Sequence, residues 1–288
     1  MIQFLKFKWV YATISAVLII AGLVSIGIWG YKYSIEFVGG TNLQYQMGKS
    51  VNVEVVKQVI TDQKVQLETI SLEKNVITAR TRPISDQQEA SIRKTLAQKL
   101  DTKVNLLKVE TIGPSLSAEL VNKTFVAVAI AAVGILLYVA YSFKNFTFAI
   151  AAVVALLHDL LILMGMYSIL SHFTSAEMDT LFVTAALTTM SFSVHDTIIM
   201  FDQLRYYIKR NGTADMEMYA NKSITETIVR SLNNSLTLFF MLLALVLLGG
   251  ATTRYFAAAL LIGTVIGTYS SPFVAMNLVV ALLKRKKS

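Results

Sequence analysis

Long apolar runs dominate the chain and predict helices that span a membrane. A helix needs about 20 consecutive apolar residues to cross a hydrocarbon core about 30 Å thick. Six runs qualify, at residues 10–29, 125–142, 146–170, 180–201, 224–248 and 255–283. The run at 224–248 is the least clean, because Arg230, Asn233 and Asn234 lie in its first turns. We therefore expect an α-helical polytopic membrane protein with six transmembrane helices.

A different pattern fills the segment between the first two runs. Alternating positions predict strands at residues 35–46, 65–71, 75–81 and 104–111, and helical spacing predicts helices at 52–61 and 85–100. The start of the second helix is well marked, since Pro83 ends the preceding strand and Ser85 with Gln88 has capping-box spacing. The order β-α-β-β-α-β is typical of a ferredoxin-like α+β domain.

These patterns divide the chain into three parts. Residues 1–30 form the N-terminus and the first transmembrane helix, 31–120 form the ferredoxin-like domain, and 121–288 form a five-helix block with a C-terminal tail. Gly39 and Gly40 fall inside the first predicted strand of the domain. They indicate a bulge or a close backbone approach, because a phosphate loop would need a helix directly after it.

Composition agrees with the apolar runs. Hydrophobic residues make up 55% of the 288 positions and charged residues 15%, and the mean hydropathy is +0.58, which excludes a typical soluble globular protein. The first run follows two lysines, as a signal peptide would. It is longer than a signal core and no small-residue cleavage site follows it, so we interpret it as a span. The absence of cysteine excludes disulfides.

The distribution of basic residues predicts the orientation in the membrane. The formal net charge is +8, and short loops on one side of the membrane carry most of the lysines and arginines. That side holds Lys6, Lys8, Lys144, Arg205, Lys209, Arg210, Lys222 and the tail Lys284, Arg285, Lys286 and Lys287, whereas Lys123 and Arg254 lie on or near the other. By the positive-inside rule both termini are cytoplasmic and residues 31–120 are extracytoplasmic. We interpret the basic tail as a contact for anionic lipid rather than for nucleic acid.

Ionisable side chains inside the spans are the candidate chemistry. Each costs about 2.5–3.5 kcal/mol on insertion scales, and the sequence places His158 with Asp159, His195 with Asp196, and Arg230 there. At about 1.5 Å per residue, Asp196 and Arg230 lie about 8 and 9 Å above the cytoplasmic ends of their spans, whereas Asp159 lies about 20 Å above its own. An interaction between Asp196 and Arg230 is therefore geometrically possible.

Such a pair suits a proton relay. A low-dielectric setting favours a neutral carboxyl group, and an approaching guanidinium favours the carboxylate, so geometry controls proton uptake. Three alternatives stay open: Asp196 and Arg230 form a static ion pair, His158 and Asp159 form a packing cluster, and His195 only orients Asp196.

Other sequence features predict packing rather than chemistry. Gly263 and Gly267 have the spacing that lets transmembrane helices approach closely, and Pro272 predicts a kink in the last span. Asp202 and Arg205, just after the fourth span, have the spacing of a local ion pair. No metal-ligand spacing, nucleophile elbow or phosphate loop occurs, so we expect neither a metal, a cofactor nor an enzyme.

Several blocks of the chain resemble the SecD/SecF family of protein-export membrane proteins. They are IEFVGGTNLQ (35–44), ETIGPSLSAEL (110–120), ALLHDLLILMG (155–165), SFSVHDTIIMFDQLR (191–205), SITETIVRSLNNSLT (223–237), GG (249–250) and LLIGTVIGTYSSPFVA (260–275). The resemblance covers nearly the full length. By position, Asp196 is similar to the family's membrane aspartate, Arg230 to its fifth-span arginine and Asp159 to the aspartate of its third-span His-Asp motif. Glu36, Gly39, Gly40, Gly113 and Pro114 belong to the blocks around the external domain.

The resemblance implies a function and partners. It implies a transmembrane fold of resistance-nodulation-division (RND) type in the bacterial cytoplasmic membrane, and a proton-motive-force-driven role in protein export beside SecD and the SecY/SecE/SecG channel. YajC, YidC, membrane lipid and the exported unfolded polypeptide are further candidate partners. The coupling ion is expected to be H⁺, with Na⁺ as the alternative. The rival functions are a non-conducting scaffold of the translocase and an RND-type small-molecule exporter.

Overall fold

The computed structural model describes residues 3–73, 75–143, 145–212 and 214–285. Lys144 and the last two basic residues of the predicted tail, Lys286 and Lys287, lie outside the described residues. The chain divides into two compact units, one made of Tyr33–Val126 and the other of Met1–Lys32 with Ala127–Ser288.

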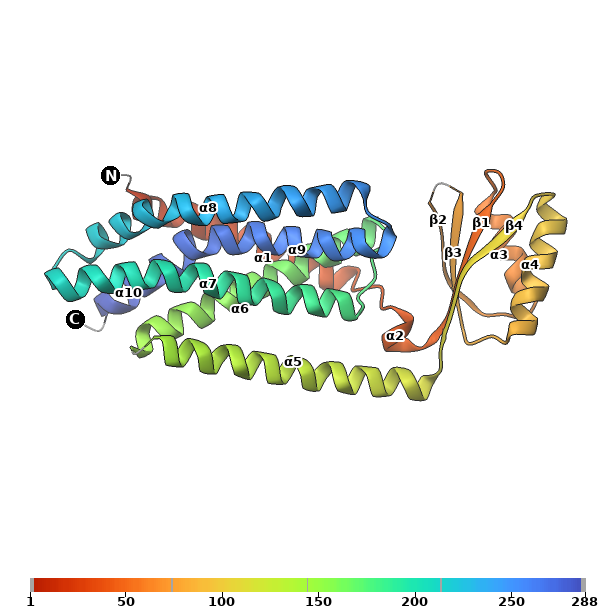
Figure 1. The fold of residues 1–288 in the computed structure, drawn as a ribbon, viewed down its shortest axis with the longest axis horizontal. Helices are drawn as coiled ribbons and strands as arrows, with labels where there is room; N and C mark the ends of the chain where they lie inside the picture. The colour runs from red at the N-terminus through yellow and green to blue at the C-terminus, as the bar shows by residue number, and fades with distance from the viewer. Residues whose placement is uncertain (1–2, 74, 144, 213, 286–288) are drawn as a thin grey trace. The chain divides into compact units, whose positions relative to one another are not determined.

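The smaller unit holds a four-stranded antiparallel sheet with two helices on one side (Figure 1). Its elements are α2 (Ile35–Val38), β1 (Gly40–Met47), α3 (Val53–Asp62), β2 (Leu67–Glu73), β3 (Val76–Thr81), α4 (Asp86–Leu100) and β4 (Val104–Ile112), and the strand order is β2-β3-β1-β4. Alternate residues of β1 and β3 meet α3 and α4 in a core that includes Leu43, Tyr45, Ile77, Val59 and Leu96. The expected helices and strands after residue 39 are therefore present.

The first predicted strand was wrong at its beginning. Residues 35–38 form the short helix α2, and the chain then passes through Gly39 at φ 75° into β1, whose first residue, Gly40, has φ 130°. A Cβ on Gly40 would lie 2.7 Å from the carbonyl oxygen of Thr81 on β3. The helical turn and the left-handed backbone at Gly39 interrupt the extended chain that the alternation in IEFV predicts, so β1 begins only at Gly40.

The start of α4 has the predicted cap. The Ser85 side chain accepts a hydrogen bond from the Gln88 backbone N–H, and the Gln88 side chain accepts one from the Ser85 backbone N–H. These two bonds satisfy backbone donors that a helix start leaves unpaired.

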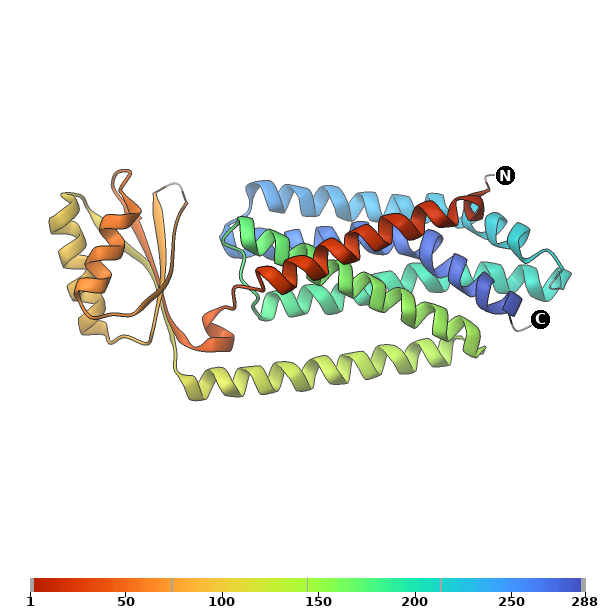
Figure 2. The ribbon, with the colours of Figure 1, turned by 180° about the vertical axis from the view of Figure 1, so that it is seen from behind.

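The larger unit is helical. It contains η1 (Phe4–Phe7), α1 (Lys8–Ile28), the second part of α5 (Pro114–Ser142), α6 (Phe146–Phe173), α7 (Thr180–Asn211), α8 (Met216–Leu248), α9 (Ala251–Ser270), η2 (Ser271–Ala275) and α10 (Met276–Arg285). Figures 1 and 2 show α6, α7, α8 and α9 side by side, and Figure 2 shows α1 crossing α6. The predicted connection between the fourth and fifth spans is mostly helical, because α7 continues to Asn211 and α8 begins at Met216.

Five segments in the described part of the chain are long and apolar enough to cross a membrane, one fewer than expected. They are Phe4–Ile28, Pro114–Ser142, Phe146–Phe173, Met216–Leu248 and Thr253–Arg285. Helix α7, although 32 residues long, falls outside this group. Its hydroxyl residues and the His195-Asp196 pair lower the hydropathy of an otherwise apolar helix. The fold is mostly helical, with five candidate membrane helices and a small antiparallel sheet.

Two local features set how the helices pack. Gly22 on α1 and Gly165 on α6 bring the two backbones into contact, since a Cβ on Gly165 would lie 2.4 Å from the Cα of Gly22. Between α9 and α10 the chain adopts a π-helical turn, η2, that contains Pro272. A π-turn near a proline is a common place for a bend, and it occurs where the sequence predicts a kink.

Candidate functional site

Asp159 on α6 lies at a junction of three helices and is fully buried (0% exposed). The Ser193 hydroxyl of α7 donates to its Oδ2 over 2.5 Å, and the Ser270 hydroxyl of α9 donates to the same oxygen over 2.6 Å. The other carboxylate oxygen lies 2.8 Å from Nδ1 of His158. His158 and Asp159, which are adjacent in sequence, thus contact each other directly. The two serines that donate to Asp159 come from two other helices.

His158 extends this cluster to α1. Its Nε2 lies 2.8 Å from the Ser15 hydroxyl oxygen, and Ser15 lies 3.3 Å from the Tyr269 hydroxyl on α9. Tyr269 in turn donates to the backbone carbonyl of Tyr11 over 2.8 Å. An unbroken chain of polar contacts therefore joins α6, α1 and α9.

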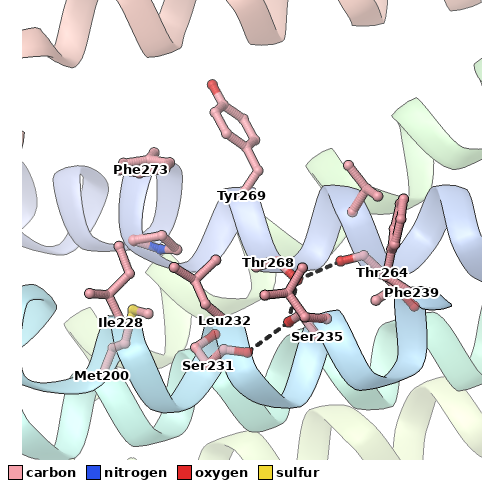
Figure 3. Close-up of a pocket in the computed structure, with 13 residues that line it drawn as sticks. Met200, Ile228, Ser231, Leu232, Ser235, Phe239, Thr264, Thr268, Tyr269 and Phe273 are labelled. Carbon is pink, nitrogen blue, oxygen red and sulfur yellow. Dashed lines mark hydrogen bonds between the residues drawn. The ribbon is translucent and has the colours of Figure 1, made fainter.

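Asp196 on α7 is the second buried carboxylate (2% exposed). The Ser231 hydroxyl of α8 donates a hydrogen bond to its Oδ2. One turn further along α8, the Ser235 hydroxyl donates to the Ser231 carbonyl over 2.8 Å and accepts a bond from Thr268 of α9 over 2.6 Å (Figure 3). Hydroxyl groups thus lead from Asp196 across α8 to α9.

A second set of hydroxyls lies between the two carboxylates. Ser271, next to the Asp159 ligand Ser270, donates to the Ser193 carbonyl over 3.4 Å and lies 2.9 Å from the Thr197 hydroxyl. Thr197 is the residue after Asp196. The junction of α9 with η2 therefore contacts Asp159 through Ser270 and contacts Thr197, the neighbour of Asp196, through Ser271.

The structure does not bring Arg230 to Asp196. The two residues were expected at similar depth, but within the described residues Arg230 is exposed and forms no ion pair with the carboxylate, whereas the next residue, Ser231, is buried against it. Successive residues of a helix point about 100° apart, so depth alone does not place two side chains together. The predicted Asp196–Arg230 interaction is therefore replaced by an Asp196–Ser231 hydrogen bond.

His195 makes no hydrogen bond to either buried carboxylate in the described residues. It is exposed, whereas its neighbours Val194 and Asp196 are buried. The histidine that contacts an aspartate in this structure is His158 instead.

Sequence reasoning missed the hydroxyl residues, although their spacing carried a signal. On α8 the buried hydroxyl residues Thr227, Ser231 and Ser235 recur every four positions, which places them on one helix face. Arg230, Asn233 and Asn234 lie off that face and are exposed. This four-residue repeat of small hydroxyl residues was the sequence signal that could have identified the face opposite the intramembrane aspartate.

The remaining predicted positions lie at turns and helix contacts. Glu36 is in α2, and Gly113 precedes Pro114, the first residue of α5. A Cβ on Gly263 would lie 2.1 Å from the Thr189 hydroxyl oxygen, and one on Gly267 would lie 3.3 Å from the Ser193 Cβ. Both glycines therefore lie where α9 packs closely on α7, the helix that carries Asp196.

A cavity of about 370 Å³ opens between α8 and the α9–η2 segment (Figure 3). Most of its wall is apolar, and its polar residues are Ser231, Ser235, Thr264, Thr268 and Tyr269. Ser231 thus contacts the cavity and the buried Asp196 at once. Among residues 3–285 that the structure describes, no group of three or more His, Cys, Asp or Glu side chains could hold a metal ion.

Comparison with known proteins adds the family. The family model described as "Protein export membrane protein SecD/SecF, C-terminal" matches residues 91–285. The chain is 35% identical to the protein translocase subunit SecF of Thermobaculum terrenum, over 98% of this chain and 94% of that protein. It is 32% identical to the subunit SecDF of Thermus thermophilus over 95% of this chain and 38% of that protein.

Solved structures agree with these matches. The crystal structure of SecDF from Thermus thermophilus, described as a translocon-associated membrane protein, matches with a TM-score of 0.88 at 30% identity and covers 99% of this chain. This chain spans 39% of that SecDF chain. A crystal structure of SecDF in a super-membrane-facing form matches with a TM-score of 0.68. This multi-pass membrane protein therefore belongs to the SecD/SecF family of protein-export membrane proteins.

Proposed function

We propose that this chain is a non-enzymatic accessory subunit of the Sec translocase that, together with SecD, uses the proton motive force to assist protein export. The observation that carries the proposal is the pair of buried carboxylates, Asp159 and Asp196, each held by hydroxyl groups. In the described part of the chain neither carboxylate is paired with a lysine or an arginine. A buried carboxylate without a fixed countercharge changes its protonation as its surroundings change, which is what a proton-driven subunit needs.

The need for a second half supports SecD as the partner. The chain spans 39% of the SecDF chain it matches, so that relative extends well beyond the matched part. Transporters of this architecture place ion sites at the interface of two related halves. We propose that SecD supplies the other half of a complete RND-type bundle, with α7 as the sixth membrane-spanning helix of this half. The SecY/SecE/SecG channel is the proposed next partner.

The smaller unit is the proposed external domain. Its element order and its strand order β2-β3-β1-β4 are those of a ferredoxin-like unit. With both termini in the cytoplasm, this domain lies outside the cytoplasmic membrane, where it would contact the emerging unfolded polypeptide.

Ion flux tests the proposal directly. Proteoliposomes that contain this chain with SecD are exposed to a proton gradient or a sodium gradient, and flux is compared between wild type and Asp196→Asn. The matched control is Asp202→Asn, which changes an exposed aspartate of the same helix that pairs with Arg205 over 3.0 Å. We expect proton flux to be lost in Asp196→Asn and kept in Asp202→Asn.

Three other outcomes would replace the proposal. Sodium-dependent flux through Asp196 would change the coupling ion. Full proton-driven export by Asp196→Asn would contradict the relay. If Asp196→Asn and Arg230→Met instead lose SecD on co-purification in proportion to lost export, the chain acts as a scaffold.

A further inference from the structure

We propose that the His158–Asp159 pair binds one exchangeable proton, and that Ser15 transmits the presence of this proton to Tyr269 on α9. The inference rests on the proposed function for its use in export. Its chemistry follows from counting the hydrogen atoms in the chain of contacts that joins α6, α1 and α9.

The count starts at Tyr269. A tyrosine hydroxyl has one hydrogen, and Tyr269 donates it to the backbone carbonyl of Tyr11 over 2.8 Å. In the 3.3 Å contact between Ser15 and Tyr269, the donor must therefore be Ser15. Ser15 also has a single hydrogen, so in its 2.8 Å contact with His158 it can only accept. Nε2 of His158 consequently carries a proton.

The 2.8 Å contact between Nδ1 of His158 and the carboxylate of Asp159 requires one more proton. Either Nδ1 holds it, which gives an imidazolium beside a carboxylate, or the carboxyl group holds it and donates to a neutral imidazole. Both arrangements give the pair a net charge of zero. Such neutrality suits side chains that are 8% and 0% exposed inside a membrane-spanning bundle.

Loss of this proton reverses the Ser15 bond. After the proton leaves to water, one proton remains between the two side chains, and it stays on Nδ1 because Nδ1 must donate to the Asp159 carboxylate. Nε2 then becomes an acceptor, and the Ser15 hydroxyl rotates to donate to it. Ser15 no longer donates to Tyr269, so a link between α1 and α9 is lost.

The change reaches α9 at two adjacent positions. Tyr269 loses its hydrogen bond from Ser15, while the next residue, Ser270, donates to a carboxylate that is charged as long as the proton is absent. Tyr269 also lines the cavity that Ser231 of the Asp196 centre contacts (Figure 3). The proton on α6 can thus alter the wall of the cavity next to the second carboxylate.

Other titratable groups near the pair do not replace this link. The titratable groups on the packed elements include Tyr11 of α1, His195 and Asp196 of α7, and Tyr269 of α9; on α10, Lys284 binds Glu217. Tyr11 enters the chain through its backbone carbonyl alone, and His195 is exposed. Among these groups in the described residues, Tyr269 alone contacts Ser15 through its side chain.

Nitrogen NMR of histidine tests the inference. The full chain, complexed with SecD in nanodiscs, is labelled with ¹⁵N-histidine and titrated with acid and base, and the exposed His172 and His195 serve as internal references. We expect His158 to carry a proton on Nε2 at low pH and on Nδ1 alone at high pH. Tyr269→Phe removes the acceptor of the Ser15 hydrogen, so the proton concentration needed to half-protonate Nε2 should rise about fivefold, the effect of one hydrogen bond.

Tyr11→Phe is the matched control, because it removes a hydroxyl on α1 and keeps the carbonyl that accepts from Tyr269. Its titration should match wild type. Equal shifts in the two variants, no shift in Tyr269→Phe, or an Nε2 without a proton across the whole pH range would overturn the inference. The NMR titration does not measure ion flux. A flux result that contradicts the Asp196 relay would therefore leave the His158–Asp159 proton site intact. An NMR result that contradicts the proton site would likewise leave the Asp196 relay intact.

Discussion

The Ser231 hydroxyl donates a hydrogen bond to the Asp196 carboxylate across the contact between α8 and α7. A hydroxyl is a neutral donor, so it holds the carboxylate in place without cancelling its charge. The arginine beside it in sequence, Arg230, is exposed. The side chain that the structure places against the Asp196 carboxylate is therefore an uncharged hydroxyl that can rotate.

Removal of the Ser231 hydroxyl should impair ion flux. Ser231→Ala leaves a buried carboxylate without its donor, and a hydrogen bond to a charged group contributes about 1.5–3 kcal/mol, so we expect flux to fall about tenfold or more. Thr237→Ala is the control, since Thr237 is an exposed hydroxyl residue of the same helix and donates to the Asn233 carbonyl. Ion flux is measured for both variants in complex with SecD. Equal losses of flux in the two variants would contradict a specific role for Ser231.

Close packing of α1 on α6 should make Gly22 intolerant of a side chain. A Cβ on Gly22 would lie 2.7 Å from the Cα of Gly165, so Gly22→Ala must separate two backbones, at a cost of about 1–3 kcal/mol. Gly27 lies on the same helix, and a Cβ there meets nothing within 4 Å. We expect thermal unfolding of the purified protein to shift down in Gly22→Ala and not in Gly27→Ala.

The attachment of the N-terminal helix η1 to α8 should depend on the hydrogen bond of one backbone N–H. The backbone N–H of Leu5 donates to the Asn221 side chain over 3.1 Å, which holds η1 against α8. Asn221→Leu removes the acceptor and leaves a buried donor unpaired, at about 1–3 kcal/mol. Hydrogen exchange at residues 4–8 should accelerate in this variant. Asn221→Asp keeps an acceptor oxygen and should stay close to wild type, and a uniform effect of both variants would contradict this account.

The external domain should lose stability at alkaline pH because of Tyr45. Burial, with the nearby Glu89 carboxylate as the second cause, raises the pKa of Tyr45 above its ordinary value. The folded state thus prefers neutral tyrosine, so its contribution to stability is complete below pH about 10 and is lost as the pH rises toward the folded pKa.

Protection of β1 amides, measured by hydrogen exchange with the intrinsic rate at each pH removed, checks this expectation. Protection should fall above pH about 10 in wild type, and this fall should be smaller in Tyr45→Phe. Tyr33→Phe, which alters a tyrosine that is 44% exposed, should follow wild type. An unchanged alkaline fall in Tyr45→Phe would show that another group is responsible.

Local signals predicted much of the fold. The capping box at Ser85 and the ion pair of Asp202 with Arg205 depend on spacing within one helix, and both are confirmed. The helical turn at residues 35–38 was missed because a four-residue apolar segment satisfies both periods. Helix α7 was expected as a sixth apolar span, yet its own polar face lowers its hydropathy.

The candidate site was harder to predict because it depends on helix rotation. The sequence indicated Asp159 and Asp196 as costly residues that need partners, and both are buried among hydroxyls. It could not show that Ser231, and not Arg230, faces Asp196, since that choice depends on about 100° of rotation between neighbours. The role of Ser15 depends on the crossing of α1 over α6, which no local pattern encodes.

Because of the π-helical turn at Ser271–Ala275, the orientation of α10 depends on the number of residues in this turn rather than on the identity of their side chains. A π-turn holds about one residue more than an α-turn, so deletion of Val274 would restore a regular ladder and rotate α10 by about 100°. Val279 and Val280 would then leave the core, and Lys284 would turn away from Glu217. Residue 274 should accept many substitutions in related sequences, and gaps at this place in their alignment should be rare.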